Sequence, residues 1–138
     1  MALAEDPRIE EALEELGIKE LTRPQVEAAP SIRAGRHVLL IAPTGIGKTE
    51  AVMIPILEAL LADRPPRIGC LYITPLRALN RDMLRRMEFF GEYLGIDVAV
   101  RHGDTSKAER TRQSRSPPEI LITTPETLQI MFTGRRLR

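Results

Sequence analysis

Tryptophan is absent from this 138-residue chain, aromatic residues make up only 4% of it, and Cys70 is its single cysteine. One cysteine cannot form an intrachain disulfide, which excludes a small secreted domain held together by disulfides, and it argues against a zinc cluster. The longest unbroken apolar run, Val38 to Ala42, is far shorter than the ~20 residues that a membrane-spanning helix needs. The sequence therefore predicts no membrane partner.

The charge of the chain is unevenly distributed. Residues 1–20 contain seven acidic and two basic side chains, the opposite of a secretory signal peptide, so we expect a cytoplasmic protein. Residues 101–138 carry a net charge of +4, and seventeen of the twenty basic residues are arginine, whose planar guanidinium suits phosphate. This composition is compatible with nucleic acid, although clustered charge on its own more often marks a solvated face.

Apolar periodicity and breaker residues predict an alternation of helices and strands within one domain. Helices are expected over residues 7–16, 24–29, 48–62, 76–90, 107–115 and 126–132, and strands over residues 37–42, 68–74, 96–100 and 119–123. Pro30 is expected to bend or end the second helix early, and Pro55 to bend the third. Four strands that alternate with helices indicate an α/β fold with an open, mostly parallel sheet.

Three of the predicted strands end in the same way, with a proline that leads towards a helix. The three turns are Ile41 to Thr44, Ile73 to Pro75 and Thr123 to Pro125. Ligands of parallel α/β sheets bind outside the carboxyl ends of the strands, where the amino ends of helices attract anions. We therefore expect the three turns to lie along one edge of the sheet and to face a shared anionic ligand.

The strongest local pattern runs from Ala42 to Thr49 and matches the P-loop pattern GxxxxGK[ST], except that Ala42 replaces the first glycine. Gly45 and Gly47 would let backbone N–H groups curl around a phosphate, Lys48 would bring positive charge to the β and γ phosphates, and Thr49 would offer a hydroxyl to Mg²⁺. The alternative is an ordinary turn with a chance match. The predicted strand before it and helix after it favour a nucleotide site.

Together with its neighbours this segment resembles the superfamily 2 DEAD/DEAH-type ATP-dependent helicases. Ala42 to Glu50 is similar to motif I, Thr74 to Asn80 to motif Ia, and Thr123 to Leu128 to motif Ib. Pro75 to Arg85 and Arg101 to Ser106 look closest to the large helicase-related (Lhr) group. The resemblance extends from about residue 17 to the end in the family's order. It implies that residues 1–138 form the amino-terminal portion of the first RecA-like domain, an incomplete P-loop NTPase fold with motifs Q, I, Ia and Ib.

The resemblance implies that ATP and Mg²⁺ are the cofactors. Their expected ligands are Gln25, Thr44, Gly45, Ile46, Gly47, Lys48 and Thr49, with Thr49 on the metal. Gln25 resembles the glutamine that reads the adenine edge, because a side-chain amide donates and accepts hydrogen bonds at once. The competing interpretation is a polar residue that only begins a helix. The family's usual aromatic partner is missing, since residues 1–20 contain no Phe, Tyr or Trp.

The resemblance further implies a single strand of DNA or RNA as partner, held through its phosphates. The residues expected to contact it are Thr74, Pro75, Arg77, Gly103, Thr124, Pro125 and Glu126. Hydroxyl and guanidinium groups beside helix amino ends suit phosphate oxygens. Four of these residues also have a plain structural role open to them: the two threonines as helix caps, Arg77 as a surface charge and Gly103 as part of a simple turn.

Hydrolysis needs a carboxylate that holds Mg²⁺ and a group that orients the attacking water. No apolar strand of the chain leads into Asp-Glu, because Val98 to Val100 leads to Arg101 and Ile120 to Ile122 leads to Thr-Thr-Pro-Glu. We expect the Asp-Glu box and the second RecA-like domain downstream of Arg138. The chain alone is then expected to bind nucleotide weakly without turnover.

The family's sheet would leave the segment 38–41 without neighbouring strands, so we also expect low stability or self-association of the isolated chain. A stand-alone nucleotide- or nucleic-acid-binding module without motor activity is the alternative function. A small P-loop kinase is a third, although nothing after Thr49 forms a recognisable Arg-rich lid.

Overall fold

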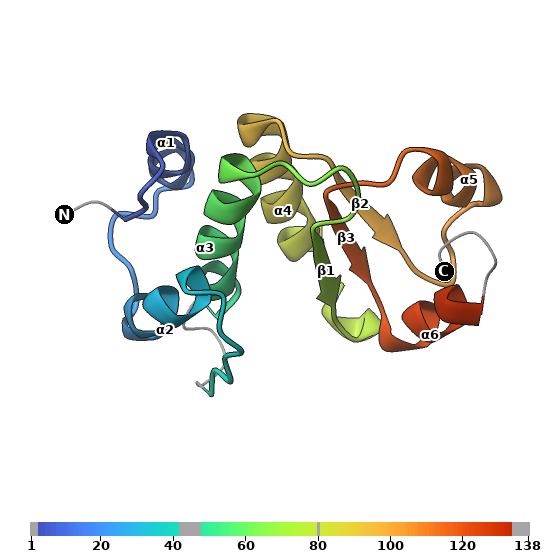
Figure 1. The fold of residues 1–138 in the computed structure, drawn as a ribbon, viewed down its shortest axis with the longest axis horizontal. Coiled ribbons are helices and arrows are strands. Elements are labelled where there is room, and N and C mark those ends of the chain that lie inside the picture. Colours follow the sequence, from blue (N-terminus) through green and yellow to red (C-terminus); the bar gives the residue numbers. More distant parts are fainter. Residues whose placement is uncertain (1–2, 42–47, 80, 134–138) are drawn as a thin grey trace. The chain divides into compact units, whose positions relative to one another are not determined.

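A computed structural model describes residues 3–41, 48–79 and 81–133, with only the backbone described at residues 48–51. The chain divides into two compact units, Met1–Arg64 and Pro65–Arg138 (Figure 1). The first unit is helical, and the second contains the β-sheet. In the described part of the chain, no helix is both long enough and apolar enough to cross a membrane.

The first unit consists of α1 (Pro7–Glu15), α2 (Arg23–Arg33) and α3 (Lys48–Ala62). α1 begins as the sequence predicts, because the Asp6 carboxylate accepts the Arg8 N–H at 2.9 Å and Pro7 occupies the first helical position. Gly17 ends the helix turn with φ 75°, a conformation that glycine adopts without strain. The side chains of Ile9 and Leu13 are fully buried, which confirms the predicted apolar stripe of this helix.

α2 extends further than expected, because Pro30 does not end it. The helix continues for three residues to Arg33, and the Pro30 carbonyl accepts the Ala34 N–H at 3.1 Å, so the hydrogen-bond ladder resumes after the proline. α2 packs along α3, and Glu58 of α3 binds the Arg33 guanidinium through both carboxylate oxygens, at 2.8 and 3.1 Å. This pair ties the end of α2 to α3.

The prediction of a buried strand over residues 37–42 is wrong for residues 37–41, the part of this range that the structure describes. Residues 36–41 form neither strand nor helix, and the side chains of Leu39 and Ile41 are each 85% exposed. An isolated strand is unstable because its N–H and C=O groups need partners on a neighbouring strand. Apolar composition alone does not supply those partners.

The sheet of the second unit has three parallel strands in the order β1-β3-β2. They are β1 (Cys70–Ile73), β2 (Val98–Arg101) and β3 (Ile120–Thr123). Three of the four predicted strands and their parallel arrangement are thus confirmed. All four residues of β3 are buried, whereas β1 alternates between half-buried and exposed residues, as expected for a central and an edge strand of this sheet.

α4 (Arg81–Leu94) and α6 (Pro125–Thr133) cover opposite faces of this sheet (Figure 1). Gly91 allows α4 to approach β2 closely, because a Cβ at this position would lie 2.8 Å from the Ile96 carbonyl oxygen and 2.9 Å from Val98 Cγ2. On the other face, Met131 of α6 packs with Ala99 and Leu121. The two helices therefore contact alternate residues of the sheet, on its two faces.

The predicted helix over residues 76–90 is divided in the structure. Leu76–Ala78 form a single 3-10 turn, Leu79 has ψ 61°, and the α-helix starts only at Arg81. Leu76 belongs to the predicted apolar stripe but is 59% exposed, so no packing of this residue holds the first turn in an α-helix. Of the other residues predicted for this stripe, Met87 and Phe90 are buried in α4, whereas Leu79 and Met83 are half-buried.

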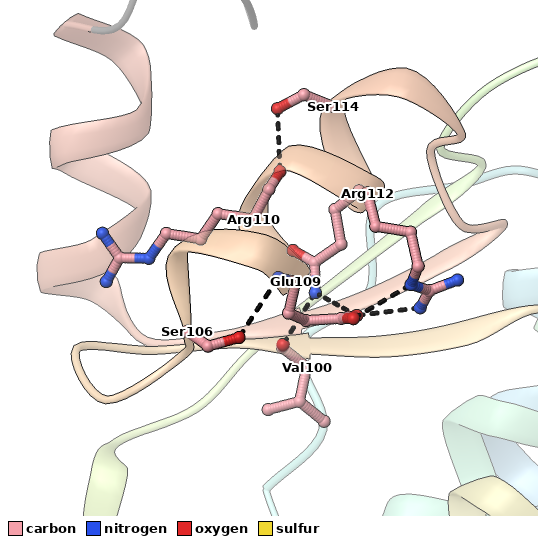
Figure 2. Close-up of polar contacts among 7 residues, drawn as sticks. Val100, Ser106, Glu109, Arg110, Arg112 and Ser114 are labelled. Atoms are coloured by element: carbon pink, nitrogen blue, oxygen red, sulfur yellow. Dashed lines mark hydrogen bonds and ion pairs between the residues drawn. The ribbon is translucent and has the colours of Figure 1, made fainter.

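α5 (Lys107–Arg115) has the bounds that the sequence predicts, although it has almost no apolar face. Figure 2 shows the polar contacts that hold it. The Ser106 hydroxyl caps the helix by accepting the Glu109 N–H at 3.1 Å, and Arg112 donates two hydrogen bonds to the Glu109 carboxylate at 2.8 and 2.9 Å. Gln113 is buried and donates to the Val100 carbonyl at 2.9 Å, which ties α5 to the edge strand β2.

These contacts predict an unusually acidic carboxyl group at Glu109. Hydrogen bonds from Arg112 and then Gln113 lower its pKa from the ordinary 4.5 to about 2. A depressed pKa contributes stability above pH 4.5 that is lost as the pH falls through about 2. We expect an NMR titration of the Glu109 carboxyl to show this pKa and Arg112→Gln to return it towards 4.5. A midpoint near the ordinary value in the unsubstituted chain would contradict the contacts of Figure 2.

Candidate functional site

The parallel register brings the ends of the three strands to one edge of the sheet. Ile73 and Arg101, the last residues of β1 and β2, both lie opposite Thr123, the last residue of β3. The turns that follow these strands begin with Thr74, His102 and Thr124. The expectation of a shared edge is therefore confirmed for two of the three proline turns, and the Gly103 loop joins them. The third turn falls largely on residues 42–47, which lie outside the described residues.

The turn after β1 places Thr74, Pro75 and Arg77 beside the end of β3. The Thr74 N–H donates to the Thr123 carbonyl at 3.0 Å, which continues the sheet hydrogen bonding by one residue. Pro75 and Arg77 are exposed. Arg77 lies in the 3-10 turn rather than inside a helix as predicted, so its charge is presented by a tight turn and not by the amino end of an α-helix.

The turn after β3 is a buried helix cap. The Thr124 hydroxyl donates to Thr127 Oγ1 at 2.9 Å and accepts the Thr127 N–H at 3.3 Å, and Thr124 is only 3% exposed. This is the structural role that the sequence left open for the threonine. Pro125 and Glu126 are exposed in the first turn of α6. A phosphate at this turn would meet the helix amino end and not the Thr124 hydroxyl.

The loop after β2 is fixed by its own hydrogen bonds. The His102 N–H donates to Thr105 Oγ1 at 2.9 Å, and the Asp104 N–H donates to His102 Nδ1 at 3.0 Å. Arg110 of α5 donates through Nη2 to the carbonyl oxygens of His102 and Gly103, at 3.2 and 3.1 Å. A Cβ at Gly103 would meet nothing within 4 Å, so packing among the described residues does not require glycine there.

Two arginines at this edge were not singled out from the sequence. Arg101 ends β2, and burial and then the neighbouring Arg110 charge lower the pKa of its guanidinium. The buried Nε atoms of both arginines lack a hydrogen-bond partner among the described residues. An arginine directly after an apolar strand is the signal that could have marked Arg101. Arg110 gave no signal, because it lies in a uniformly polar helix.

The structure describes only some of the residues that are expected to bind the nucleotide. Thr44 to Gly47 lie outside the described residues, as do the side chains of Lys48 and Thr49, while the start of α3 at Lys48 confirms the helix predicted after the P-loop. Gln25 is 5% exposed, and its Oε1 accepts the Thr22 N–H at 2.7 Å in a capping box at the start of α2. The helix-start role of Gln25 is thus present, and the adenine contact stays a prediction.

Cys70 and His102 are not arranged for catalysis within the described part of the chain. Burial raises the pKa of the Cys70 thiol on β1, which makes it a poor nucleophile at neutral pH. His102 is held by the Asp104 N–H. Within residues 3–41, 48–79 and 81–133, no three His, Cys, Asp or Glu side chains gather as a metal site.

Comparisons with known proteins agree on the kind of chain this is. The family model "DEAD/DEAH box helicase" matches residues 22–138. The chain is 38% identical over 133 residues to "ATP-dependent helicase Lhr-Core" of Sulfolobus acidocaldarius, with 87% of this chain and 15% of that protein covered. It is 40% identical over 135 residues to the protein of the same name from Methanothermobacter thermautotrophicus, with 86% and 16% covered.

A solved structure extends this likeness to three dimensions. It is described as "Structure of Mycobacterium smegmatis helicase Lhr bound to ssDNA and AMP-PNP", and it matches with a TM-score of 0.81 and 31% sequence identity. The match covers 95% of this chain and 18% of that one. The chain thus spans only about 15% of the length of the curated relatives that it matches.

Proposed function

The chain belongs to the DEAD/DEAH box helicase family, and we propose that it forms the ATP-binding and nucleic-acid-contacting part of an ATP-dependent helicase. Its fold is that of a RecA-like helicase domain. In the full-length protein, ATP hydrolysis would open and close two RecA-like lobes and so move a strand. The carboxylates that hydrolysis requires would come from another part of the full-length protein. The chain alone therefore binds nucleotide weakly and does not turn it over.

ATP and Mg²⁺ would be held by the first unit. The amino end of α3 follows the P-loop segment directly, and such an end attracts phosphate through its unpaired N–H groups and its dipole. The segment from Thr44 to Thr49 would surround the triphosphate, with Lys48 against the terminal phosphates and Thr49 on Mg²⁺. Bound Mg·ATP supplies the phosphoryl group whose transfer to water drives the motor. Gln25, at the start of the helix that packs along α3, would read the adenine.

The nucleic-acid strand would lie along the sheet edge formed by the second unit. The single observation that carries this proposal is the register of the sheet, which places the turns at Thr74, Gly103 and Thr124 at the same edge. The exposed Arg77 and the open space at Gly103 would let a phosphate backbone approach the protein main chain. The relative from Mycobacterium smegmatis has been solved with ssDNA, which supports a single strand as the ligand.

Fluorescence anisotropy with labelled single-stranded DNA and RNA tests this function. We expect the chain to bind a single strand with an affinity that falls as salt rises, because each neutralised phosphate releases counterions. Arg77→Ala is expected to weaken binding, and Arg64→Ala removes one charge from the first unit as a control. Absence of strand binding at low salt would overturn the proposal. An affinity for the single strand that changes neither with an ATP analogue nor with Lys48→Ala would favour the stand-alone module instead.

Gln25→Glu separates the two roles of this residue. A glutamate keeps the acceptor oxygen that the Thr22 N–H needs, while it loses the amide donor for adenine. We therefore expect α2 to persist in the circular dichroism spectrum and the preference for ATP over GTP and CTP to fall about tenfold, roughly the contribution of one specific hydrogen bond. Competition binding with the three nucleotides measures the preference. An unchanged ratio would leave Gln25 with its capping role alone.

A further inference from the structure

One carboxylate in the first unit joins three segments of the chain. Glu58 of α3 accepts two hydrogen bonds from the Arg33 guanidinium at the end of α2, and its Oε1 also accepts the Glu5 N–H at 2.9 Å. The Glu58 side chain is only 10% exposed, and that of Arg33 is 29% exposed. A bidentate ion pair that is largely shielded from water holds a more defined geometry than a solvated surface pair. This pair therefore fixes the end of α2 on α3.

The remainder of the contact between α2 and α3 involves small side chains. The buried residues of α2 are Gln25, Ala28 and Ala29, which share one face of the helix, and α2 packs along α3 (Figure 1). Val26 is 53% exposed. An alanine methyl group makes few van der Waals contacts, so it allows the helices to approach closely but resists their rotation only weakly. The direction of α2 thus depends on the ion pair at its end.

The two alanines lie between Gln25 and the ion pair along α2. Without the ion pair, α2 can turn about the alanine contact, and its two ends then move in opposite directions. Gln25 precedes the alanines by three and four residues, about 5 Å along the helix axis, so a turn of about 10° would shift it by about 1 Å. Donor–acceptor distances in hydrogen bonds vary by only about 0.5 Å. Such a turn would therefore weaken a contact between Gln25 and a base.

Glu58 lies far along α3 from the residues that are predicted to hold the phosphates. It follows Lys48 by ten residues, which is about 15 Å along the helix. A substitution at Glu58 is therefore expected to change how the base is recognised and to leave the phosphate contacts in place.

We propose that Glu58 is a positioning residue for base recognition: by binding Arg33 it holds α2 at the angle at which Gln25 meets the adenine of ATP. The proposal rests on the proposed function, because it requires Gln25 to contact the base. It deepens that function, because it makes base selectivity depend on an ion pair at the opposite end of α2. Neither Glu58 nor Arg33 contacts the nucleotide itself. Loss of the pair should weaken discrimination between bases while the triphosphate stays bound.

Glu58→Gln tests the ion pair, with Glu5→Gln as the matched control. Each variant loses one negative charge beside Arg33, but the Glu5 carboxylate lies 3.7 Å from Arg33 Nε and is 74% exposed, whereas that of Glu58 lies at 2.8 Å. We expect Glu58→Gln to lower the ratio of ATP to GTP affinity about threefold, because the hydrogen bond to adenine is weakened and not removed. Glu5→Gln should leave this ratio unchanged. Competition binding of the two nucleotides with Mg²⁺ measures it.

Three further measurements separate positioning from folding. Binding of inorganic tripolyphosphate with Mg²⁺, which offers no base, should be the same in Glu58→Gln and the unsubstituted chain. Arg33→Gln removes the same ion pair from its more exposed partner and should lower the ATP to GTP ratio equally, so the test remains decisive if Glu58→Gln does not fold. The double variant of Gln25→Glu and Glu58→Gln should show the ratio of Gln25→Glu alone, because residues that act through one contact have non-additive effects.

The outcomes distinguish this inference from the proposed function. A ratio that Gln25→Glu lowers, and that neither Glu58→Gln nor Arg33→Gln changes, would overturn the inference and leave the proposed function standing. An equal loss of affinity for ATP, GTP and tripolyphosphate in these two variants would also overturn it, because the ion pair would then have a structural role alone. A ratio unchanged by Gln25→Glu would overturn the adenine contact together with this inference. Absence of nucleotide binding by the unsubstituted chain would overturn the proposed binding of ATP as well.

Discussion

Lys48→Ala is expected to lower strand-stimulated ATP hydrolysis by the full-length protein about a hundredfold or more. The ammonium group is predicted to neutralise charge on the β and γ phosphates, and removing one preorganised group that stabilises the transition state typically costs 10²–10³ in rate. We propose that the isolated chain binds an ATP analogue weakly, and the same substitution should abolish this binding. A colorimetric phosphate assay and analogue titration measure the two effects.

The chain offers a matched control for this substitution, because it contains only two other lysines, Lys19 and Lys107. Lys19 is exposed in the first unit, so Lys19→Ala removes the same charge without approaching the P-loop segment. It should leave both hydrolysis and binding unchanged. The isolated chain should show no steady hydrolysis. If it hydrolyses ATP and Lys48→Ala abolishes this activity, then the carboxylate that we place elsewhere in the full-length protein is not needed.

Ile122→Ala is expected to reduce the free energy of unfolding by about 2–5 kcal/mol, the usual effect of deleting a fully buried isoleucine side chain down to Cβ. Ile122 is 0% exposed in the central strand β3, between Tyr72 of β1 and Val100 of β2. Small domains are stable by only about 5–15 kcal/mol, so this variant would lie near the limit of folding. Urea unfolding followed by circular dichroism measures the loss.

Ile130→Ala is the control, because it deletes the same atoms from a side chain that is 67% exposed on α6. Its effect should stay within about 0.5 kcal/mol. The contrast between the two isoleucines tests whether β3 is the central strand, since a sheet with β3 at its edge would expose Ile122. Similar effects for both variants would contradict the strand order β1-β3-β2.

Much of the fold could be predicted from local patterns. α1 begins after the capping residue Asp6 and α3 begins at the end of the P-loop pattern, because such a signal and its helix are adjacent in sequence, and α5 has its predicted bounds. The strands β1, β2 and β3 were recognised from apolar runs between breakers. The alternation of these strands with helices indicates the mostly parallel sheet. Four motifs in the family's order indicate the family.

The errors have physical causes that adjacent residues do not reveal. Residues 38–41 have the composition of a buried strand, but a strand needs partners on a neighbouring strand, and Val38, Leu39 and Ile41 are exposed. The apolar spacing after Leu76 is helical, yet Leu76 is 59% exposed and the first turn is a 3-10 turn. Pro30 is expected to bend or end α2 early, and α2 does not end there because the hydrogen-bond ladder resumes beyond it.

For the candidate site, the sequence by itself determined which residue types are available: the glycines, Lys48 and Thr49 of the P-loop pattern, and the threonine turns after two strands. Only the tertiary structure decided that the Thr124 hydroxyl caps a helix and that Arg101 and Arg110, nine residues apart, lie at one edge of the sheet with no paired carboxylate among the described residues. The reason is that hydrogen-bond partners and burial depend on the strand register and on how helices pack, which are properties of residues far apart in the chain.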